Sequence, residues 1–190
     1  QAYLSSASSP RPPWNQAGNL FNYLPPPNCL PAIAALHGQV MQQVSHLAHE
    51  HGAWGLTHLD LHFANFFADL AHNRVMLFDF DDCACGWFVM DLAMLFFDWS
   101  VLAPPGQREA ELLRLSKPLL AGYRSQQTLS SFWMEQIPLF ARLLELNLYL
   151  DLAPGYAPSQ ANGWVDKFLY QRQERILDQI PVIPASCLVG

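Results

Sequence analysis

Apolar residues recur at helical spacing from Ile33 to Leu47, in steps of three and four, and Gly52 follows the last of them. This pattern predicts an amphipathic helix of about five turns. Three histidines of the region alternate with Gln and Glu and are expected at solvated or rim positions rather than as ligands: His37, His46 and His49.

Residues 87–100 are apolar nearly all round, with Asp91 inside the run, which is typical of a buried helix. Another helix is predicted over residues 107–123, kinked at Pro118. Residues 144–152 alternate with period two, as in a strand, but they contain no β-branched residue and are mostly strong helix formers. We therefore predict a helix there.

A last helix is predicted over residues 164–179. Residues 66–68 and 75–78 flank a turn-prone stretch, which predicts a β-hairpin with a longer loop. Residues 1–31 hold seven of the fifteen prolines, so residues 1–30 are expected to be an extended lead-in or linker, and 31–190 the folded domain.

The composition indicates one folded domain, since 51% of the 190 residues are hydrophobic and only 14% are charged, against roughly 25% in an average soluble domain. The net charge of −6 and the small number of lysines indicate no nucleic-acid partner, because neutralising phosphates needs clustered cations. No apolar run approaches the roughly 20 residues of a membrane span, so no membrane partner is expected. Four cysteines are too few for a disulfide scaffold, which favours a cytoplasmic location.

The residues that suggest chemistry are concentrated between positions 58 and 91. Carboxylate and amide oxygens around a loop and a short hairpin form the kind of site that Mg²⁺ prefers. The order His-x-Asp-x-x-x-x-Asn, hairpin, Asp-Phe is the arrangement by which kinase-like enzymes transfer phosphoryl groups. The polar members of this region are His58, Asp60, Asn65, Asp79, Asp81 and Asp91.

Three blocks of this region resemble the aminoglycoside phosphotransferase and choline kinase-like family of small-molecule kinases. The usual catalytic loop, His-Gly-Asp-Leu-His-Pro-x-Asn, is similar to residues 58–65, which read His-Leu-Asp-Leu-His-Phe-Ala-Asn. The usual Ile-Asp-Phe-Asp-Asp strand is similar to residues 78–82, and a Gly-Trp with a later Asp-Leu-Ala stands at 86–87 and 91–93. Close similarity covers about residues 54–97, and the departures are Leu59 for Gly and Phe63-Ala64 for Pro-x.

The resemblance implies an α+β, mostly helical fold, namely the C-terminal lobe of a protein-kinase-like fold with a short hairpin at the catalytic site. It implies ATP- and Mg²⁺-dependent transfer of the γ-phosphoryl group to a small hydroxyl-bearing acceptor. Relatives use amino sugars, amino alcohols, amino acids and protein hydroxyls. By position in the motifs, Asp60 is the catalytic base, Asn65 and Asp79 are the Mg²⁺ ligands, and His58 and Asp91 support the loop.

The nucleotide-binding lobe of such kinases has no counterpart ahead of His58. No Gly-x-Gly-x-x-Gly occurs, and no lysine precedes Lys117. Without a glycine-rich loop to cover ATP and a lysine to anchor its phosphates, the chain would form only one side of the ATP-binding cleft. The chain alone is therefore expected to be inactive.

Two other functions are consistent with the same residues. One is a non-catalytic lobe, truncated or degenerate, that keeps the fold. The other is a metal-dependent hydrolase built on His58, Asp60 and His62. Acidic and aromatic residues that could line an acceptor pocket are Asp81, Asp82 and Trp87, followed by Asp98, Trp99, Tyr149 and Asp151.

Overall fold

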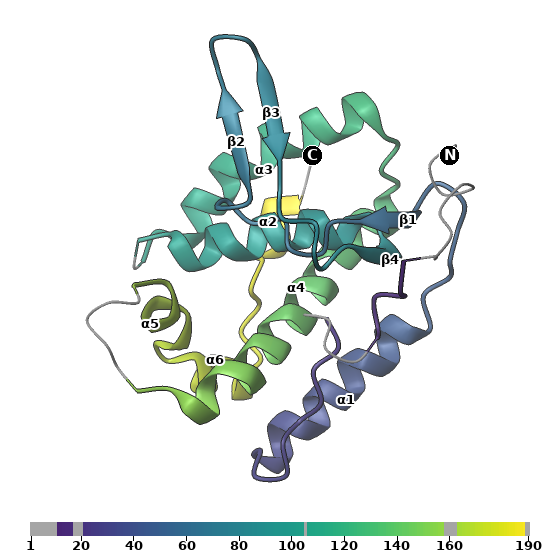
Figure 1. Ribbon diagram of the computed structural model, residues 1–190. Coiled ribbons are helices and arrows are strands. Elements are labelled where there is room, and N and C mark those ends of the chain that lie inside the picture. Colours follow the sequence, from purple (N-terminus) through teal and green to yellow (C-terminus); the bar gives the residue numbers. More distant parts are fainter. Residues whose placement is uncertain (1–10, 17–20, 105, 158–162, 189–190) are drawn as a thin grey trace.

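The structure is a computed structural model that describes residues 11–16, 21–104, 106–157 and 163–188. These residues form a mixed α/β, mostly helical fold with two small antiparallel sheets (Figure 1). The helices within them are α1 (Pro31–Ser45), α2 (Val89–Leu102), α3 (Arg108–Gln126), α4 (Ser131–Leu152), α5 (Gly163–Leu169) and α6 (Arg172–Leu177). The strands are β1 (Trp54–Thr57), β2 (Phe66–Asp69), β3 (Arg74–Leu77) and β4 (Ala84–Trp87), and short 3-10 turns lie at Ala153–Gly155 and Ala185–Leu188.

Helices α2 and α4 form the centre of the core. The apolar sequence of α2 is buried on nearly all sides, because α3 and α4 both pack against it. The prediction of a helix over residues 144–152 is confirmed, since these residues complete α4. Ser130 caps the start of α4, where its side chain accepts a hydrogen bond from Trp133 N at 3.3 Å. None of the described helices is long and apolar enough to cross a membrane.

Helix α1 begins at Pro31, which suits the first turn of a helix, and packs along α4. The prediction of a solvated His37 is wrong. Its side chain is buried, and its Nε2 lies 2.9 Å from Asn147 Oδ1 on α4. Because α4 supplies this polar partner, a histidine is tolerated on the buried face of α1. His46 and His49 are exposed, as predicted.

The predicted last helix is two helices. Gln171 adopts a left-handed backbone conformation with φ of 50°, which separates α5 from α6. A continuous amphipathic pattern does not show such a break, because the apolar residues of both helices face the same core.

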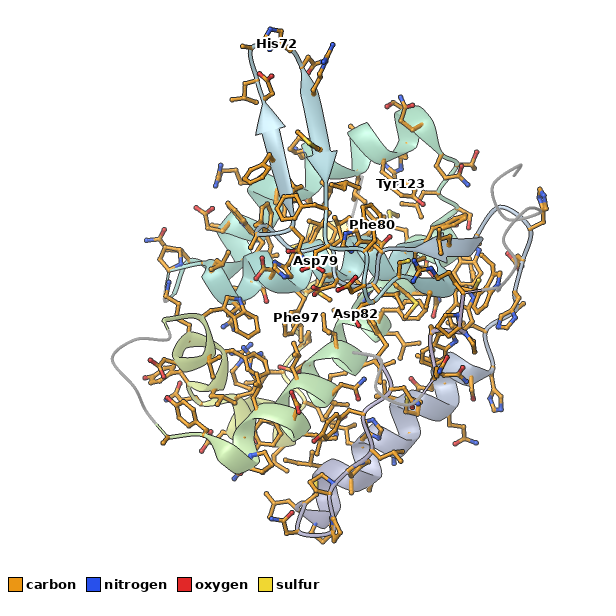
Figure 2. The ribbon with its side chains drawn as sticks, in the orientation of Figure 1. His72, Asp79, Phe80, Asp82, Phe97 and Tyr123 are labelled. Carbon is orange, nitrogen blue, oxygen red and sulfur yellow. The ribbon has the colours of Figure 1, made fainter. Side chains whose placement is uncertain are left out.

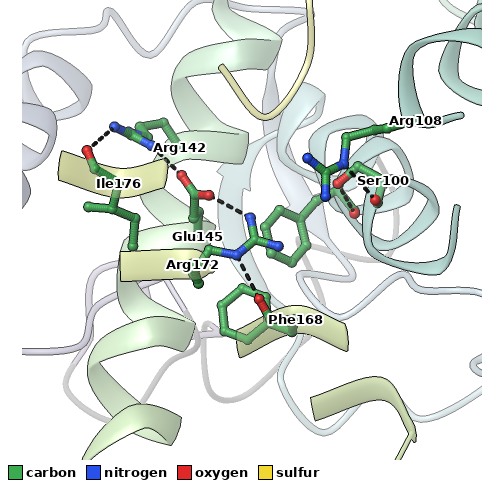
Figure 3. A network of polar contacts seen from close by, with 8 residues as sticks. Ser100, Arg108, Arg142, Glu145, Phe168, Arg172 and Ile176 are labelled. Atoms are coloured by element: carbon green, nitrogen blue, oxygen red, sulfur yellow. Dashed lines mark hydrogen bonds and ion pairs between the residues drawn. The ribbon is translucent and has the colours of Figure 1, made fainter. Parts of the chain in front are cut away.

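A buried ion-pair network joins α4 to α5 and α6 (Figure 3). It consists of Arg142, Glu145 and Arg172. Glu145 has no exposed surface and pairs with both arginines; Arg172 Nη1 lies 2.6 Å from Glu145 Oε1. The arginines also donate to backbone oxygens, Arg142 to Ile176 O at 2.9 Å and Arg172 to Phe168 O at 2.8 Å. These contacts hold α5 and α6 against α4.

The predicted hairpin is present as β2 paired with β3, and it projects from the body of the molecule (Figure 1). A second pair, β1 with β4, has no counterpart in the predicted elements. Each of these two strands is four residues long and contains one glycine, so neither carries a clear strand pattern. A Cβ at Gly86 would lie 2.8 Å from Met90 Sδ and 3.1 Å from Thr57 Oγ1, so these side chains would have to shift to admit a larger residue.

The described part of the proline-rich lead-in contains no helix, as expected, but it is packed against the domain. Trp14 N donates to Cys85 O and Cys85 N donates to Pro12 O, both at 2.9 Å. Trp14 and Phe21 are buried in the core. Residues 1–10 and 17–20 lie outside the described residues.

Candidate active site

The loop of residues 58–65 connects β1 to the hairpin and is held by the first turn of α2. Asp91 Oδ2 accepts a hydrogen bond from His58 N at 3.0 Å, and Asp91 Oδ1 accepts one from Leu59 N at 2.9 Å. Asp91 therefore contacts the loop that it is expected to support, and its side chain is half-buried. Burial raises the pKa of the Asp91 carboxyl, although the two backbone donors oppose the shift.

Leu59 occupies the position where the family motif has glycine, and its φ is 63°. Glycine adopts this left-handed conformation freely, whereas a leucine there costs about 1–2 kcal/mol. The fully buried Leu59 side chain and the hydrogen bond to Asp91 offset that cost. The loop therefore has a backbone turn that explains the glycine of the motif, even though the glycine has been replaced.

Asn65 links the loop to the hairpin. Its buried amide nitrogen donates to Asp60 O at 2.9 Å and to Asp60 Oδ2 at 2.8 Å. Because the amide nitrogen is used on Asp60, the amide oxygen is the atom left to face a cation. Phe78 N donates to Asn65 O at 3.2 Å, which brings the end of β3, and Asp79 after it, to the same loop.

His58 connects the same two segments from the other side. Its Nε2 lies 2.9 Å from Phe78 O, so Nε2 carries the hydrogen and donates. The ring packs on Phe80, with centroids 4.6 Å apart, and the buried Nδ1 has no hydrogen-bond partner among the described residues. This geometry is that of a structural support between the loop and Asp79.

Carboxylates gather where the base of the hairpin meets the body, as Asp79 and Asp82 show in Figure 2, while His72 lies at the hairpin tip. Burial, followed by the charges of Asp60, Asp79 and Asp81, raises the pKa of Asp82. Within the described residues, no Arg or Lys forms an ion pair with Asp60, Asp79 or Asp81. The local field therefore attracts cations.

The His62 ring contacts the carboxylate of the predicted base. Its Nε2 lies 3.5 Å from Asp60 Oδ2, and its Nδ1 accepts a hydrogen bond from Ala64 N at 3.1 Å. The hydrogen bond to Asp60 raises the pKa of His62, with partial burial acting against it. The pKa of His62 is therefore higher than that of an ordinary histidine, and the hydrogen bond from Ala64 N belongs to the neutral ring, because a protonated ring has no acceptor nitrogen.

The donor set fits a hard divalent cation, because a carboxylate and an amide oxygen are on hand and the neighbouring carboxylates add negative charge. In the described ranges, no group of three or more His, Cys, Asp or Glu is arranged to hold a metal by itself. The hydrolase built on His58, Asp60 and His62 is therefore not supported. A cation bound by Asn65 and Asp79 would need further oxygens from a phosphate ligand or water.

A pocket of about 580 Å³ opens beside Asp60, and α2, α4, α5 and the loop form its walls. Its lining consists of Asp60, His62, Phe63, Ala64, Met94, Phe97, Asp98, Leu102, Leu148 and Trp164. Most of these residues are apolar, and no Lys or Arg is among them.

Of the seven residues predicted for an acceptor pocket, Asp98 lines this one. The prediction for Trp87 is wrong: its ring is buried against Trp14 and Trp54, and Nε1 donates to Ala48 O at 2.9 Å. Asp81 and Asp82 lie exposed between β3 and β4, outside the lining. The others also lie elsewhere: Trp99, Tyr149 and Asp151.

Phe97, Leu148 and Trp164 come from three helices and were missed as pocket residues. Each reads as an ordinary apolar position of an amphipathic or buried helix, so the sequence carries no signal for them. Only the packing of α2, α4 and α5 brings them together beside Asp60.

Comparison with known proteins matches residues 5–125 to the phosphotransferase enzyme family, APH, over more than half of the chain. The chain belongs to this family. It is 31% identical over 112 residues to amicoumacin kinase of Bacillus subtilis (strain 168), a match that covers 58% of this chain and 33% of that protein. The family membership confirms the resemblance seen in the three sequence blocks.

Two solved structures of small-molecule kinases have a similar fold. Amicoumacin kinase hAmiN in complex with AMP-PNP, Ca²⁺ and Ami superposes with a TM-score of 0.77 at 23% identity over 96% of this chain. A microcompartment-associated aminopropanol kinase superposes with a TM-score of 0.56 at 18% identity over 92% of this chain. The chain spans 56% of each of these two solved kinase chains and about a third of the Bacillus subtilis protein.

Proposed function

We propose that this phosphotransferase-family chain takes part in ATP- and Mg²⁺-dependent transfer of the γ-phosphoryl group to a hydroxyl of a small molecule. One observation carries the proposal: a single hydrogen-bonded loop joins Asp60, Asn65 and the end of β3 just before Asp79. This is the order of base and metal ligands that phosphoryl transfer needs.

In the proposed mechanism, Asp60 orients the acceptor hydroxyl and takes its proton, while Asn65 holds the Asp60 carboxylate in place. Asn65 and Asp79 are proposed to hold Mg²⁺, which when bound neutralises charge on the transferring phosphates. Asp91 and His58 keep the loop in position through the hydrogen bonds described above. A positioned general base of this kind contributes roughly 10²–10⁴-fold to a rate.

The neighbouring pocket supports a small acceptor with an apolar body and a hydroxyl or amino end. Met94, Phe97 and Leu148 offer an apolar surface, whereas Asp60 and Asp98 provide negative charge at one side. Among the described residues, no Lys or Arg lines the pocket, which disfavours anionic acceptors. The relatives named for amicoumacin and aminopropanol support an amino-containing acceptor.

We further propose that residues 31–190, with the packed lead-in, act as the C-terminal lobe beside a nucleotide-binding lobe that lies outside them. The sequence offers neither a Gly-x-Gly-x-x-Gly nor a lysine before Lys117 to anchor phosphates. The retained left-handed turn at Leu59 supports a catalytic lobe over a degenerate one, since a loop without function has no need of that conformation.

The test compares the 190-residue chain with the same chain joined to an upstream nucleotide-binding lobe, here called the two-lobe protein. Transfer of labelled phosphate from ATP to amicoumacin, 1-amino-2-propanol and an amino sugar is measured for both. We expect transfer by the two-lobe protein only, and its loss in Asp60→Asn by at least about 100-fold. Transfer by the 190-residue chain alone would contradict the two-lobe proposal, and an Asp60→Asn protein with full activity would contradict the catalytic role.

A further inference from the structure

Asp98 is buried in the middle of α2, 5% exposed, and both of its carboxylate oxygens accept hydrogen bonds. Oδ2 accepts from the backbone N of Phe63 in the candidate catalytic loop at 3.0 Å. Oδ1 accepts from the indole Nε1 of Trp164 on α5 at 2.8 Å. One carboxylate therefore joins two segments separated by about a hundred residues of chain.

The Phe63 hydrogen bond depends on a departure from the family motif. The usual loop has proline at this position, and proline has no N–H to donate. Phe63 provides the donor, and its ring packs against Trp99 with centroids 4.9 Å apart. The bond to Asp98 is thus a property of this chain that the common motif cannot have.

The three linked residues also share a surface. Phe63, Asp98 and Trp164 all line the pocket beside Asp60. Trp164 stacks on Phe168 of the same helix, with ring centroids 5.4 Å apart and planes 16° from parallel. Phe168 therefore supports the Trp164 ring within α5. Moving α5 would therefore change the pocket wall and pull on the loop through Asp98.

We propose that Asp98 is a positioning residue that sets the catalytic loop against the α5 wall of the acceptor pocket. The inference rests on the proposed function, because it assigns the 580 Å³ pocket to the acceptor. Asp98 holds the loop midway between Asp60 and Asn65, so losing the bond at Phe63 lets the base drift from the acceptor hydroxyl. Losing the bond at Trp164 loosens the wall that binds the acceptor body.

The first experiment uses a matched pair of variants in the two-lobe protein. Phe63→Pro removes the N–H and restores the family motif, whereas Phe63→Leu keeps the N–H and removes the ring. With amicoumacin as acceptor, we expect Phe63→Pro to lower kcat by about 10-fold or more, because small displacements of a catalytic group are costly. Phe63→Leu is expected to lower kcat by less than about 3-fold, and KM for ATP to stay unchanged in both. Equal kcat in the two variants would overturn the proposal.

The second experiment tests whether one carboxylate links the two segments. Trp164→Phe keeps an aromatic ring without the N–H and is expected to raise the acceptor KM by about 5-fold, with a smaller effect on kcat. In an Asp98→Ala background the same change should have no further effect on KM, since the bond is already lost. Additive effects of the two changes would show that Asp98 does not couple them and would overturn the proposal.

A readout without catalysis separates this inference from the proposed function. In the ¹⁵N-labelled 190-residue chain, the Trp164 indole N–H and the Phe63 amide are expected to exchange slowly with solvent. Both should exchange at least about 10-fold faster in Asp98→Ala, while amides in α4 keep their protection. Unchanged exchange of both groups overturns the link itself. The other outcome is faster exchange in Asp98→Ala together with a two-lobe protein that transfers no phosphate. This would support the link from Phe63 through Asp98 to Trp164 and contradict only the proposed function.

Discussion

Two regions of this molecule use carboxylates in opposite ways. At Glu145, the carboxylate is fully buried and paired with Arg142 and Arg172 (Figure 3). On the loop side, Asp79 and Asp81 are exposed, and within the described residues neither has an Arg or Lys partner. A carboxylate whose charge is neutralised by neighbouring arginines has a structural role, whereas a carboxylate without such partners can bind a cation from solution.

The pKa shifts of neighbouring groups follow the same contrast. Near Glu145, burial and the charges of Arg175 and Arg172 lower the pKa of Arg108 to about 10. Near Asp79, burial and other carboxylates raise the pKa of Asp82. The first region thus carries an excess of positive charge and the second an excess of negative charge, so the two respond differently to mutation, metal and pH.

The largest stability effect is expected for Glu145→Gln. This change leaves Arg142 and Arg172 without their anionic partner inside the protein, and breaking such a buried pair typically costs about 3–5 kcal/mol. Urea unfolding measures the loss, with Glu174→Gln on the exposed side of α6 as the matched control. A decrease in the free energy of unfolding of less than about 0.5 kcal/mol would mean that the ion-pair network does not hold α4 to α5 and α6.

Asp91→Ala should have the next largest effect, because Asp91 is a carboxylate balanced by backbone N–H groups instead of arginines. The change leaves His58 N and Leu59 N without an acceptor, which typically costs about 1–3 kcal/mol in each such network. Thermal unfolding provides the measurement, and Asp91→Asn, which keeps one acceptor oxygen, should lose less. An Asp91→Ala protein with an unchanged Tm would rule out the tether.

Asp79→Ala is expected to cost about 1 kcal/mol in metal-free buffer, because Asp tolerates the left-handed backbone of this position, with φ of 64°, better than Ala does. The exposed carboxylate itself, which has no Arg or Lys partner among the described residues, stabilises little. Mg²⁺ at millimolar concentration should raise the Tm of the unmodified chain and leave that of Asp79→Ala unchanged. Asp151→Ala, an exposed carboxylate on α4, serves as the control that keeps the Mg²⁺ response. The same Mg²⁺ shift in all three proteins would remove Asp79 from the metal site.

The smallest effect concerns the pH dependence of stability at Asp82. Its pKa is raised above the ordinary 3.8, so the Asp82 carboxyl binds its proton more tightly in the folded chain than in the unfolded chain. Ionised Asp82 therefore costs stability, and the cost appears as the pH rises from 3.8 through the folded-state pKa. Asp82→Asn should be more stable than the unmodified chain at pH 7, by less than about 1 kcal/mol because solvent screens this site.

Asp82→Asn and the unmodified chain should become equally stable as the pH falls toward 3.8. Urea titrations between about pH 3.8 and about pH 7 measure the difference in their free energies of unfolding. A stability gain from Asp82→Asn that does not change with pH would arise from packing or hydrogen bonding rather than from charge.

The elements that could be predicted are those whose pattern is long or whose chemistry is local. Of residues 87–100, which are apolar nearly all round, 89–100 lie in the buried helix α2, whereas Trp87 ends β4. The alternating residues 144–152 are helical because helix formers outweigh the alternation. The roles given to Asp60, Asn65 and Asp79 remain predictions. The loop that joins them is present, because its turns and hydrogen bonds are formed within a few residues.

The elements that escaped prediction depend on partners distant in the chain. β1 and β4 are too short to carry a pattern, and they become strands only by pairing across about thirty residues. His37 is buried because Asn147 lies opposite, and Trp87 is a core residue because Trp14 and Trp54 surround it. None of these partners can be inferred from the spacing around the residue itself.

The sequence by itself therefore determined the family, the order of the catalytic motifs and the helical character of the chain, since each is written in short-range spacing. Only the tertiary structure decided what surrounds them. The pocket beside Asp60 is assembled from α2, α4 and α5, and Asp98 acquires its role from Phe63 and Trp164, which lie far from each other along the chain. The physical reason is that apolar packing is not directional: an apolar helix position specifies burial, but not the side chains against which it is buried.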